Sequence, residues 1–451
     1  MFDSHFRTLF LSTPAKLNFK DKRLIISLKN ELDNGGETTS YPLNGSLNKD
    51  IKYKAKSPHQ ILESKATISH KIKFNPSLKA LNNVPHKYTK NTNQEAKNTY
   101  CDTYKDEIAI PLSDILCLII ESRQVSLSSY LLNELAKEKV LVFVCDEFHL
   151  PSGIFTPFLG HYRSLSILQN QINLSKQKKA ILWQKIIKQK ILNQANLLEF
   201  IKIKKASELH SLAKSVHLGD SSNNEAKAAA IYFPALFQSI ANIKGFSRKI
   251  SGSKIWQGDR TSPKKQTDFE SQTPNIHTDS PDNINHPKNF NFDDIKSLQN
   301  INLQDEQIVV INAALNYGYA IVRGMVVRAI CASGLNPALG IFHSNQFNPF
   351  NLADDLMEPY RIFVDSLVAQ MLENKELQES FSISNRAKLA EILSASVLLS
   401  EEQKIYPLHR AIIKGVQSLS RSMSADVELI LPVFEGEKSN GREIYESASD
   451  V

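Results

Sequence analysis

The chain has 451 residues, of which 41% are apolar and 22% charged, so it is too long for a peptide or a disulfide miniprotein and has an ordinary globular composition. Its 16 Gly and 18 Pro are few for an all-β protein, and we expect helices to dominate. The four Cys lie far apart and form no C-x-x-C pair. This spacing argues against a disulfide framework or a thiolate zinc site and favours a reducing, cytoplasmic location.

The net charge of +7 is concentrated in one segment of the chain. Residues 49–105 hold twelve Lys and four acidic residues, a charge of +8, so the rest of the chain sums to −1. A second lysine-rich stretch, 176–208, has nine Lys within a helical pattern. A polyanion is therefore a reasonable partner, although lysines on a helix more often form a solvated face.

In chain order, alternating apolar residues first predict strands at 8–11, 17–19 and 23–28. Further strands are predicted at 107–110, 117–120 and 140–144, with a helix over 127–139 that Ser126 would cap. The stretch between the two groups, 35–105, is a basic low-complexity insertion because it has too few apolar residues to bury. We therefore predict a β-rich N-terminal domain over residues 1–150.

Helical spacing of apolar residues then predicts a C-terminal domain over 155–430, interrupted by a polar insertion at 246–305 and followed by a polar tail at 431–451. The apolar run 313–331 contains Arg323 and Arg328, so we interpret it as a buried helix and not a membrane span. Both arginines then need acidic or phosphate partners, and the Ala and Gly residues of 312–324 allow close packing of neighbouring helices.

The predicted fold class is α+β: a small N-terminal β-rich domain followed by a larger all-α C-terminal domain, with two polar insertions. The first residues lack the apolar core of a signal peptide, because their apolar run is only four residues long. We therefore expect neither export nor a membrane association.

Common catalytic signatures, such as the phosphate-binding loop, H-E-x-x-H and G-x-S-x-G, are missing from the sequence. What remains is His343 followed by Asp354, Asp355 and Glu358. Pro349 can begin a helix that places Asp354 and Glu358 on one face, where the carboxylates repel unless a divalent cation lies between them. With a nitrogen from His343, such a set suits Mg²⁺ or Mn²⁺. The alternative is a solvated acidic helix start beside an ordinary loop histidine.

Glu225 is a further carboxylate, located at the start of a predicted helix. Ser222 and Glu225 form the pattern of a capping box, S-x-x-E, in which the glutamate only satisfies a backbone N–H. The residues alone favour this structural role, and leave a role in metal binding open.

Several segments, in the right order, resemble the CRISPR adaptation integrase, the metal-dependent endonuclease that inserts new spacers. The segments are 118–122, 125–132, 142–146, 224–233, the run NAALNYGY at 312–319, His343, and DDLMEPYR at 354–361. The fifteen-residue step from His343 to Glu358 is typical of the type II branch of CRISPR systems. The resemblance covers about residues 1–34, 106–245 and 306–430, and neither polar insertion is part of it.

The resemblance implies that Glu225, His343 and Glu358 bind Mg²⁺ or Mn²⁺, with Asp354 as a second-tier acid and no role for Asp355. It also implies three partners: double-stranded DNA, a second copy of the chain in a homodimer, and the small second adaptation protein of CRISPR loci. Basic residues that could contact DNA phosphates outside the site are Lys178, Lys185, Lys188, Arg248 and Lys249.

The implied reaction is a metal-assisted transesterification, in which the 3′-hydroxyl of a short DNA fragment attacks a phosphodiester at a repeat boundary. His343 must be neutral to bind a metal, so activity should fall as the pH drops through its titration range, about 6.5 if unperturbed. Two alternatives remain open: a stand-alone metal nuclease acting on branched or free DNA, and a non-catalytic DNA-binding scaffold subunit. A strand-transfer assay separates them.

Overall fold

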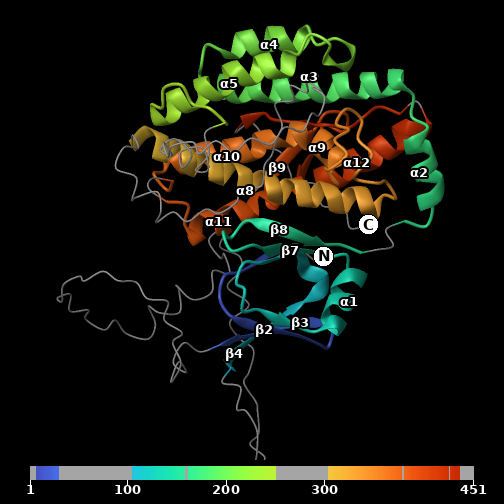
Figure 1. The fold of residues 1–451 in the computed structure, drawn as a ribbon, viewed down its shortest axis with the longest axis vertical. Coiled ribbons are helices and arrows are strands. Elements are labelled where there is room, and N and C mark those ends of the chain that lie inside the picture. The colour runs from blue at the N-terminus through green and yellow to red at the C-terminus, as the bar shows by residue number, and fades with distance from the viewer. Residues whose placement is uncertain are drawn as a thin grey trace, which may run out of the picture. The chain divides into compact units, whose positions relative to one another are not determined.

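The computed structural model describes residues 7–29, 104–157, 161–249, 303–377, 380–425 and 427–436 (Figure 1). These residues form two compact units, one within Met1–Asp146 and Pro151–Pro157, the other within Glu147–Leu150 and Phe158–Val451. Most of the predicted insertions 35–105 and 246–305, and of the predicted tail 431–451, lies outside the described residues.

The first unit holds two four-stranded sheets. One sheet is formed by β1 (Arg7–Leu11), β5 (Ile115–Ile120), β7 (Leu141–Cys145) and β8 (Pro151–Phe155), in the order β1-β5-β7-β8. Its first three strands are parallel, and β8 is antiparallel to β7. The other has the order β4-β3-β2-β6, with strands β2 (Ala15–Lys20), β3 (Arg23–Lys29), β4 (Tyr104–Pro111) and β6 (Ser126–Leu127). All six residues of β5 are buried, as expected for a strand that has parallel neighbours on both edges.

Helix α1 (Ser129–Lys137) of this unit begins later than the sequence predicts. The predicted cap, Ser126, lies in strand β6, and it is Ser128 whose side chain accepts a hydrogen bond from the backbone N–H of Leu131, at 3.2 Å. The prediction chose the wrong serine because both precede the apolar periodicity, and only the pairing of β6 with β2 distinguishes them.

The second unit is mainly helical. Its helices are α2 (Ser164–Ile172), α3 (Lys176–Phe200), α4 (Ala206–Lys214), α5 (Asn224–Ala241), α8 (Leu303–Ala332), α9 (Asn351–Met357), α10 (Arg361–Glu373), α11 (Ile383–Ala390) and α12 (Leu408–Ser424). Short 3-10 helices lie at η4 (Leu218–Asp220), η5 (Glu358–Tyr360) and η6 (Glu391–Ser394). The predicted fold class, a β-rich part followed by a larger helical part, is confirmed. The helical unit also contains a small antiparallel sheet that the sequence did not predict, of order β10-β9-β11, formed by Ile405–Pro407, Ser396–Leu399 and Pro432–Val433.

Helix α8 is the central helix of the second unit and packs against α9, α10, α11 and α12 (Figure 1). Its segment Glu306–Ala332 is long and apolar enough to cross a membrane, but 78% of the most apolar window is buried inside the protein. Burial of this kind is typical of a core helix. The close packing predicted for its small residues is confirmed at Gly318, where an added Cβ atom would lie 2.4 Å from Cγ1 of Val364 in α10.

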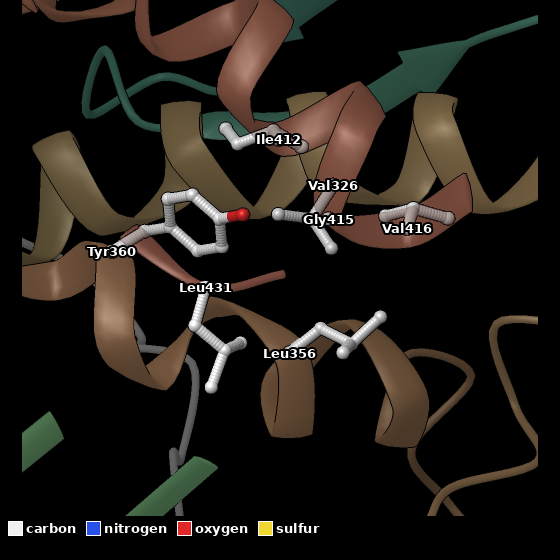
Figure 2. A pocket seen from close by; sticks show the side chains of 7 residues that line it. All are labelled: Val326, Leu356, Tyr360, Ile412, Gly415, Val416 and Leu431. Atoms are coloured by element: carbon white, nitrogen blue, oxygen red, sulfur yellow. The ribbon is translucent and has the colours of Figure 1, made fainter. Parts of the chain in front are cut away.

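The core of the second unit encloses a small cavity between α8, α9, η5 and α12 (Figure 2). Its volume is about 10 Å³, and it is lined by Val326, Leu356, Tyr360, Ile412, Gly415, Val416 and Leu431. The hydroxyl of Tyr360, the one polar side-chain group in this lining, donates to the carbonyl of Ala411 at 3.1 Å. The cavity is therefore a packing gap, since it is at the lower limit for one water molecule and offers almost no polar partner.

Candidate active site

Two of the predicted metal ligands, Glu225 and Glu358, meet at the same cation. The ammonium nitrogen of Lys190, in α3, lies 2.5 Å from Oε1 of Glu225 and 2.5 Å from Oε2 of Glu358. The exposed fractions of these side chains are 13% for Lys190, 28% for Glu225 and 5% for Glu358. The two carboxylates, 133 residues apart in the chain, are thus brought within reach of one shared positive charge.

Glu225 is free for this contact because another residue caps its helix. The backbone N–H groups of Asn224 and Glu225 donate to the two carboxylate oxygens of Asp220, at 2.9 and 3.0 Å. The N-cap residue Asn223 has a left-handed backbone, with φ of 53°, and makes no side-chain cap hydrogen bond. The capping box predicted for Ser222 and Glu225 is therefore wrong, since Asp220 satisfies the orphan donors that a box would serve.

Glu358 follows directly after α9 and is held by a cation at each oxygen. Nη2 of Arg361 lies 2.8 Å from Oε1, while Lys190 faces Oε2. Burial alone would raise the pKa of Glu358, but Arg361 and Lys190 more than offset it, and the pKa is lowered from its ordinary value. Burial would likewise lower the pKa of Lys190, yet Glu225 and Glu358 raise it. The carboxylate of Glu358 and the ammonium of Lys190 are therefore both charged at neutral pH.

His343 lies in the loop between α8 and α9 and is oriented by Asp355. Its Nδ1 is 2.6 Å from Oδ1 of Asp355, and its ring meets the ring of Trp183 edge-on, with centroids 5.7 Å apart. The same carboxylate, fully buried, accepts the backbone N–H groups of Ile341, Phe342 and His343 at 2.6, 3.0 and 3.1 Å. Because Nδ1 faces Asp355, a metal would have to bind through Nε2.

The prediction that Asp355 has no role is thus wrong. Asp355 fixes both the backbone of the loop and the ring of His343, through the four contacts given above. Only glycine fits at Gly340 without a shift of its neighbours. An added Cβ atom would lie 2.1 Å from the carbonyl oxygen of His343 and 2.9 Å from Oδ2 of Asp355. The loop is therefore wrapped tightly around this carboxylate.

Asp354, the second-tier acid, points to a different set of partners. Its Oδ2 accepts a hydrogen bond from Nδ2 of Asn348 at 2.7 Å, and its Oδ1 lies 3.8 Å from Nη1 of Arg323. Arg323 also lies over the ring of Phe350, at 5.5 Å from its centroid. The acidic partner predicted for Arg323 in the apolar helix α8 is confirmed.

A buried polar cluster lies next to Glu358, around Asp365 of α10. Tyr232 donates to Oδ2 of Asp365 at 3.0 Å, and Tyr319 donates to Oδ1. Burial raises the pKa of Asp365 to about 6, although both hydroxyl donors act in the opposite direction. The guanidinium of Arg361 lies 4.8 Å from the centroid of the Tyr319 ring, so one arginine connects this cluster to Glu358.

Of the predicted DNA contacts, Lys178, Lys185 and Lys188 lie along α3, and Arg248 lies over the ring of Tyr319, at 5.4 Å from its centroid. Arg248 donates through Nη1 and Nη2 to the side-chain oxygens of Asn312 and Asn316, at 2.6 Å each, so its guanidinium is held by α8. Lys185 pairs with Glu428 at 2.6 Å on the surface. Lys188 and Lys249 are exposed, and Lys178 is half-buried. The structure does not bring these five residues together at one place with the acidic pair, and their contact with DNA stays a prediction.

The donor set fits a cation, although not as three ready-made ligands. Among the described residues, no group of three His, Cys, Asp or Glu side chains is arranged to hold a metal ion. Two buried carboxylate oxygens, Oδ1 of Asp354 and Oε2 of Glu358, nevertheless lack a hydrogen-bond donor. Oε2 of Glu358 forms an ion pair with the ammonium nitrogen of Lys190, at 2.5 Å. Carboxylate oxygens with a nearby imidazole suit Mg²⁺ or Mn²⁺, but Lys190 holds the position between the acids.

Comparisons with known proteins identify the family of the chain. The family described as CRISPR associated protein Cas1 matches residues 90–251 and 310–402. The CRISPR-associated endonuclease Cas1 of Neisseria meningitidis serogroup C is 32% identical over 316 residues, covering 70% of this chain and 83% of the relative. That of Thermus thermophilus is 37% identical over 110 residues, covering 24% of this chain and 32% of the relative.

A solved structure of a casposase bound to integration product shares the fold, with a TM-score of 0.56, 15% identity, and coverage of 95% of this chain and 93% of that one. The family match and the relatives support a nuclease or integrase. The chain belongs to the Cas1 family of CRISPR-associated endonucleases.

Three residues of the site, Lys190, Arg361 and Asp365, were missed by the sequence analysis, and Asp355 was named without being given a role. Lys190 is one of nine lysines in 176–208, and nothing local separates it from the others. Asp355 and Arg361 belong to the segment DDLMEPYR, whose several charges in an otherwise apolar helix were a usable signal, since buried charges need partners. Asp365 follows four residues later and could have been found in the same way.

Proposed function

We propose that this protein is a metal-dependent DNA endonuclease and integrase that inserts short DNA fragments as spacers into a CRISPR array. In the reaction, the 3′-hydroxyl of the fragment attacks a phosphodiester at the boundary of a repeat and displaces the 3′-oxygen of the cut strand. One observation carries the proposal: Glu225 and Glu358 converge on a single cation position, and His343 is close enough to Glu358 to influence its charge. The casposase of the same fold, which was bound to integration product, supports it.

Glu225, Glu358 and Nε2 of His343 would hold Mg²⁺ or Mn²⁺ in this proposal, with Asp354 as a further acid. A bound divalent ion would polarise the phosphodiester and stabilise the charge that develops at phosphorus. The protein's own residues prepare this position. Asp355 orients His343, and Arg361 keeps Glu358 ionised through its 2.8 Å contact. No nucleophilic side chain is required, because the substrate supplies the hydroxyl.

The partners follow from the family and remain part of the proposal. They are double-stranded DNA, as spacer precursor and as CRISPR repeat, a second copy of this chain in a homodimer, and the small second CRISPR adaptation protein. The lysines of α3 contribute to DNA binding by positioning the phosphates, since lysine contacts of this kind carry no sequence information.

The test is a strand-transfer assay with a labelled DNA fragment and a plasmid that carries a CRISPR repeat, in Mg²⁺ or Mn²⁺. The intact protein is compared with Glu225→Gln, His343→Ala and Glu358→Gln, and with Lys388→Met as a control in an ion pair outside the site. We expect joined product from the intact protein and from the control, and a loss of at least about 100-fold in the three site variants.

Each of two other results would identify one of the competing functions. Cutting of the plasmid or of branched DNA without joined product would identify a stand-alone nuclease. If the intact protein and all three site variants bind DNA alike and give no product in either metal, the chain is a non-catalytic DNA-binding subunit and the proposal is wrong.

A further inference from the structure

Lys190 has an unusual place for a lysine. It lies in the middle of α3, its side chain is 13% exposed, and the neighbouring Ile186, Ile187 and Ile191 are fully buried. A lysine ammonium is strongly hydrated and is rarely buried unless it is paired. Here it is paired twice, at 2.5 Å from each of two carboxylates. Lys190 and the two carboxylates together carry a net charge of −1, which Arg361, at 2.8 Å from Oε1 of Glu358, brings to zero.

The pairing is also needed by the acids. Glu358 is nearly inaccessible, with an exposed fraction of 4%, and Arg361 neutralises only its Oε1 side. Without Lys190, Oε2 of Glu358 and Oε1 of Glu225 would lie next to each other with no counter-charge between them, separated by no more than the sum of two 2.5 Å contacts. Two carboxylates at such a separation repel each other, so Lys190 holds them together.

A divalent ion and the ammonium group of Lys190 cannot use this position together. An ion held by the carboxylates of Glu225 and Glu358 would lie close to the ammonium group that already contacts both of them, and two cations at such short range repel each other. The lysine has a long flexible stem and is not fully enclosed, so its ammonium group can move out to solvent when a stronger cation arrives.

We propose that Lys190 is an internal counter-ion that fills the cation position between Glu225 and Glu358 in the metal-free protein, and that a divalent ion binds only by displacing its ammonium group. This inference rests on the proposed function, because it assumes that the two glutamates are metal ligands. It makes Lys190 a positioning residue: it holds the two acids together before the metal binds, and it competes with the metal for them.

The first experiment uses the unaltered full-length protein. An amine-reactive reagent is applied with and without saturating Mn²⁺, and the labelled lysines are identified by mass spectrometry of peptides. Lys190 should be protected in the metal-free protein and become at least about fivefold more reactive with Mn²⁺, the lower end of the usual range for coupled sites. Lys188, which is exposed two residues earlier on the same helix, should be labelled equally in both states. Equal protection of Lys190 in both states would overturn the proposal.

The second experiment measures Mn²⁺ affinity by electron paramagnetic resonance, which requires no activity. Lys190→Met keeps the length of the stem and removes the competing charge, so Mn²⁺ should bind about 5–150-fold more tightly. The control is Lys388→Met, which removes a lysine that pairs with Glu376 at 2.7 Å outside the site; its affinity should equal that of the unaltered protein. Lys190→Met should also gain more thermal stability from Mn²⁺ than the unaltered protein does, because the ion replaces the missing counter-charge.

The results distinguish this inference from the proposed function. If the unaltered protein binds Mn²⁺ and Glu225→Gln binds it more weakly, but Lys190→Met binds it no more tightly, the acids are ligands and the displacement idea is wrong. If neither the unaltered protein nor Lys190→Met binds Mn²⁺, both the inference and the metal-dependent function are wrong. A Lys190→Met chain that folds only with Mn²⁺ would support the inference. One that does not fold in either condition leaves the decision to the labelling experiment.

Discussion

Replacing Asp355 by Asn should disturb the loop of His343 without changing the size of the side chain. The carboxylate accepts four hydrogen bonds, two at Oδ2 from the backbone of Ile341 and Phe342, and two at Oδ1 from the backbone and ring of His343. An Asn side chain has one oxygen and one NH₂ group, so it can serve only one of these pairs as an acceptor. The nitrogens of the other pair, which are donors themselves, would face the NH₂ group of the Asn side chain.

The expected loss of stability follows from the number of these hydrogen bonds that Asn cannot accept. If the amide oxygen keeps the contacts of Ile341 and Phe342, the NH₂ group faces the two nitrogens of His343. The ring can adapt by moving its proton from Nδ1 to Nε2 and accepting from the amide, whereas the backbone N–H of His343 cannot adapt. One hydrogen bond to a charged group is lost outright, so the free energy of unfolding should fall by about 2–3 kcal/mol.

The change of tautomer has a second consequence. A ring protonated at Nε2 presents a hydrogen where a metal would bind, so Mn²⁺ affinity should fall by about 10–100-fold. Urea unfolding measures the first effect and Mn²⁺ titration the second. Asp354→Asn is the comparison for stability, because Asp354 accepts one side-chain hydrogen bond, from Asn348, and does not hold the loop backbone. This substitution should lower the free energy of unfolding by less. Unchanged stability together with unchanged Mn²⁺ affinity in Asp355→Asn would refute the reasoning.

Three further predictions concern other parts of the helical unit. Gly318→Ala should destabilise the protein by about 1–3 kcal/mol in urea unfolding, because the new methyl group would collide with Val364; no loss would show that α8 and α10 can separate freely. The pKa of the buried carboxyl of Asp365 is raised to about 6, so this group binds a proton more tightly in the folded protein than in the unfolded chain. Its contribution to the free energy of unfolding should therefore fall by about 2 kcal/mol as the pH rises from about 4 to 7. Asp365→Asn should lack this fall, and parallel pH profiles of the two proteins would contradict the shift. If Lys178 and Lys188 contact DNA phosphates, replacing both by Met should reduce the slope of log affinity against log salt concentration by about 2; an unchanged slope in a filter-binding titration would leave them as a solvated surface.

Much of the secondary structure was predictable because it depends on the pattern of apolar and polar residues within short segments. The alternation in 23–28 and the continuous apolar run of 117–120 correspond to β3 and to the buried β5, since a strand buried on both faces has no polar positions. The apolar helix with Arg323 was predicted as a core helix because charged residues are costly inside a membrane span. The small sheet of β9, β10 and β11 was missed, because strands of two to four residues carry too short a pattern.

Local capping was less predictable than periodicity. Ser222 and Glu225 match a capping box, yet Asp220 caps α5, and Ser128 caps α1 in place of Ser126. Several oxygen-bearing residues near a helix start can satisfy the same N–H groups, and the backbone of the preceding loop decides which of them does.

The amino-acid order by itself determined the types of the main elements, the acids and histidine worth considering, and the family that they resemble. The packing of α3, α5 and η5 decided which of nine neighbouring lysines meets two distant glutamates, and the path of one loop decided that Asp355 holds His343 while the adjacent Asp354 does not. Periodicity is a property of a few consecutive residues, whereas a charge finds its partner only after segments more than a hundred residues apart have been packed together.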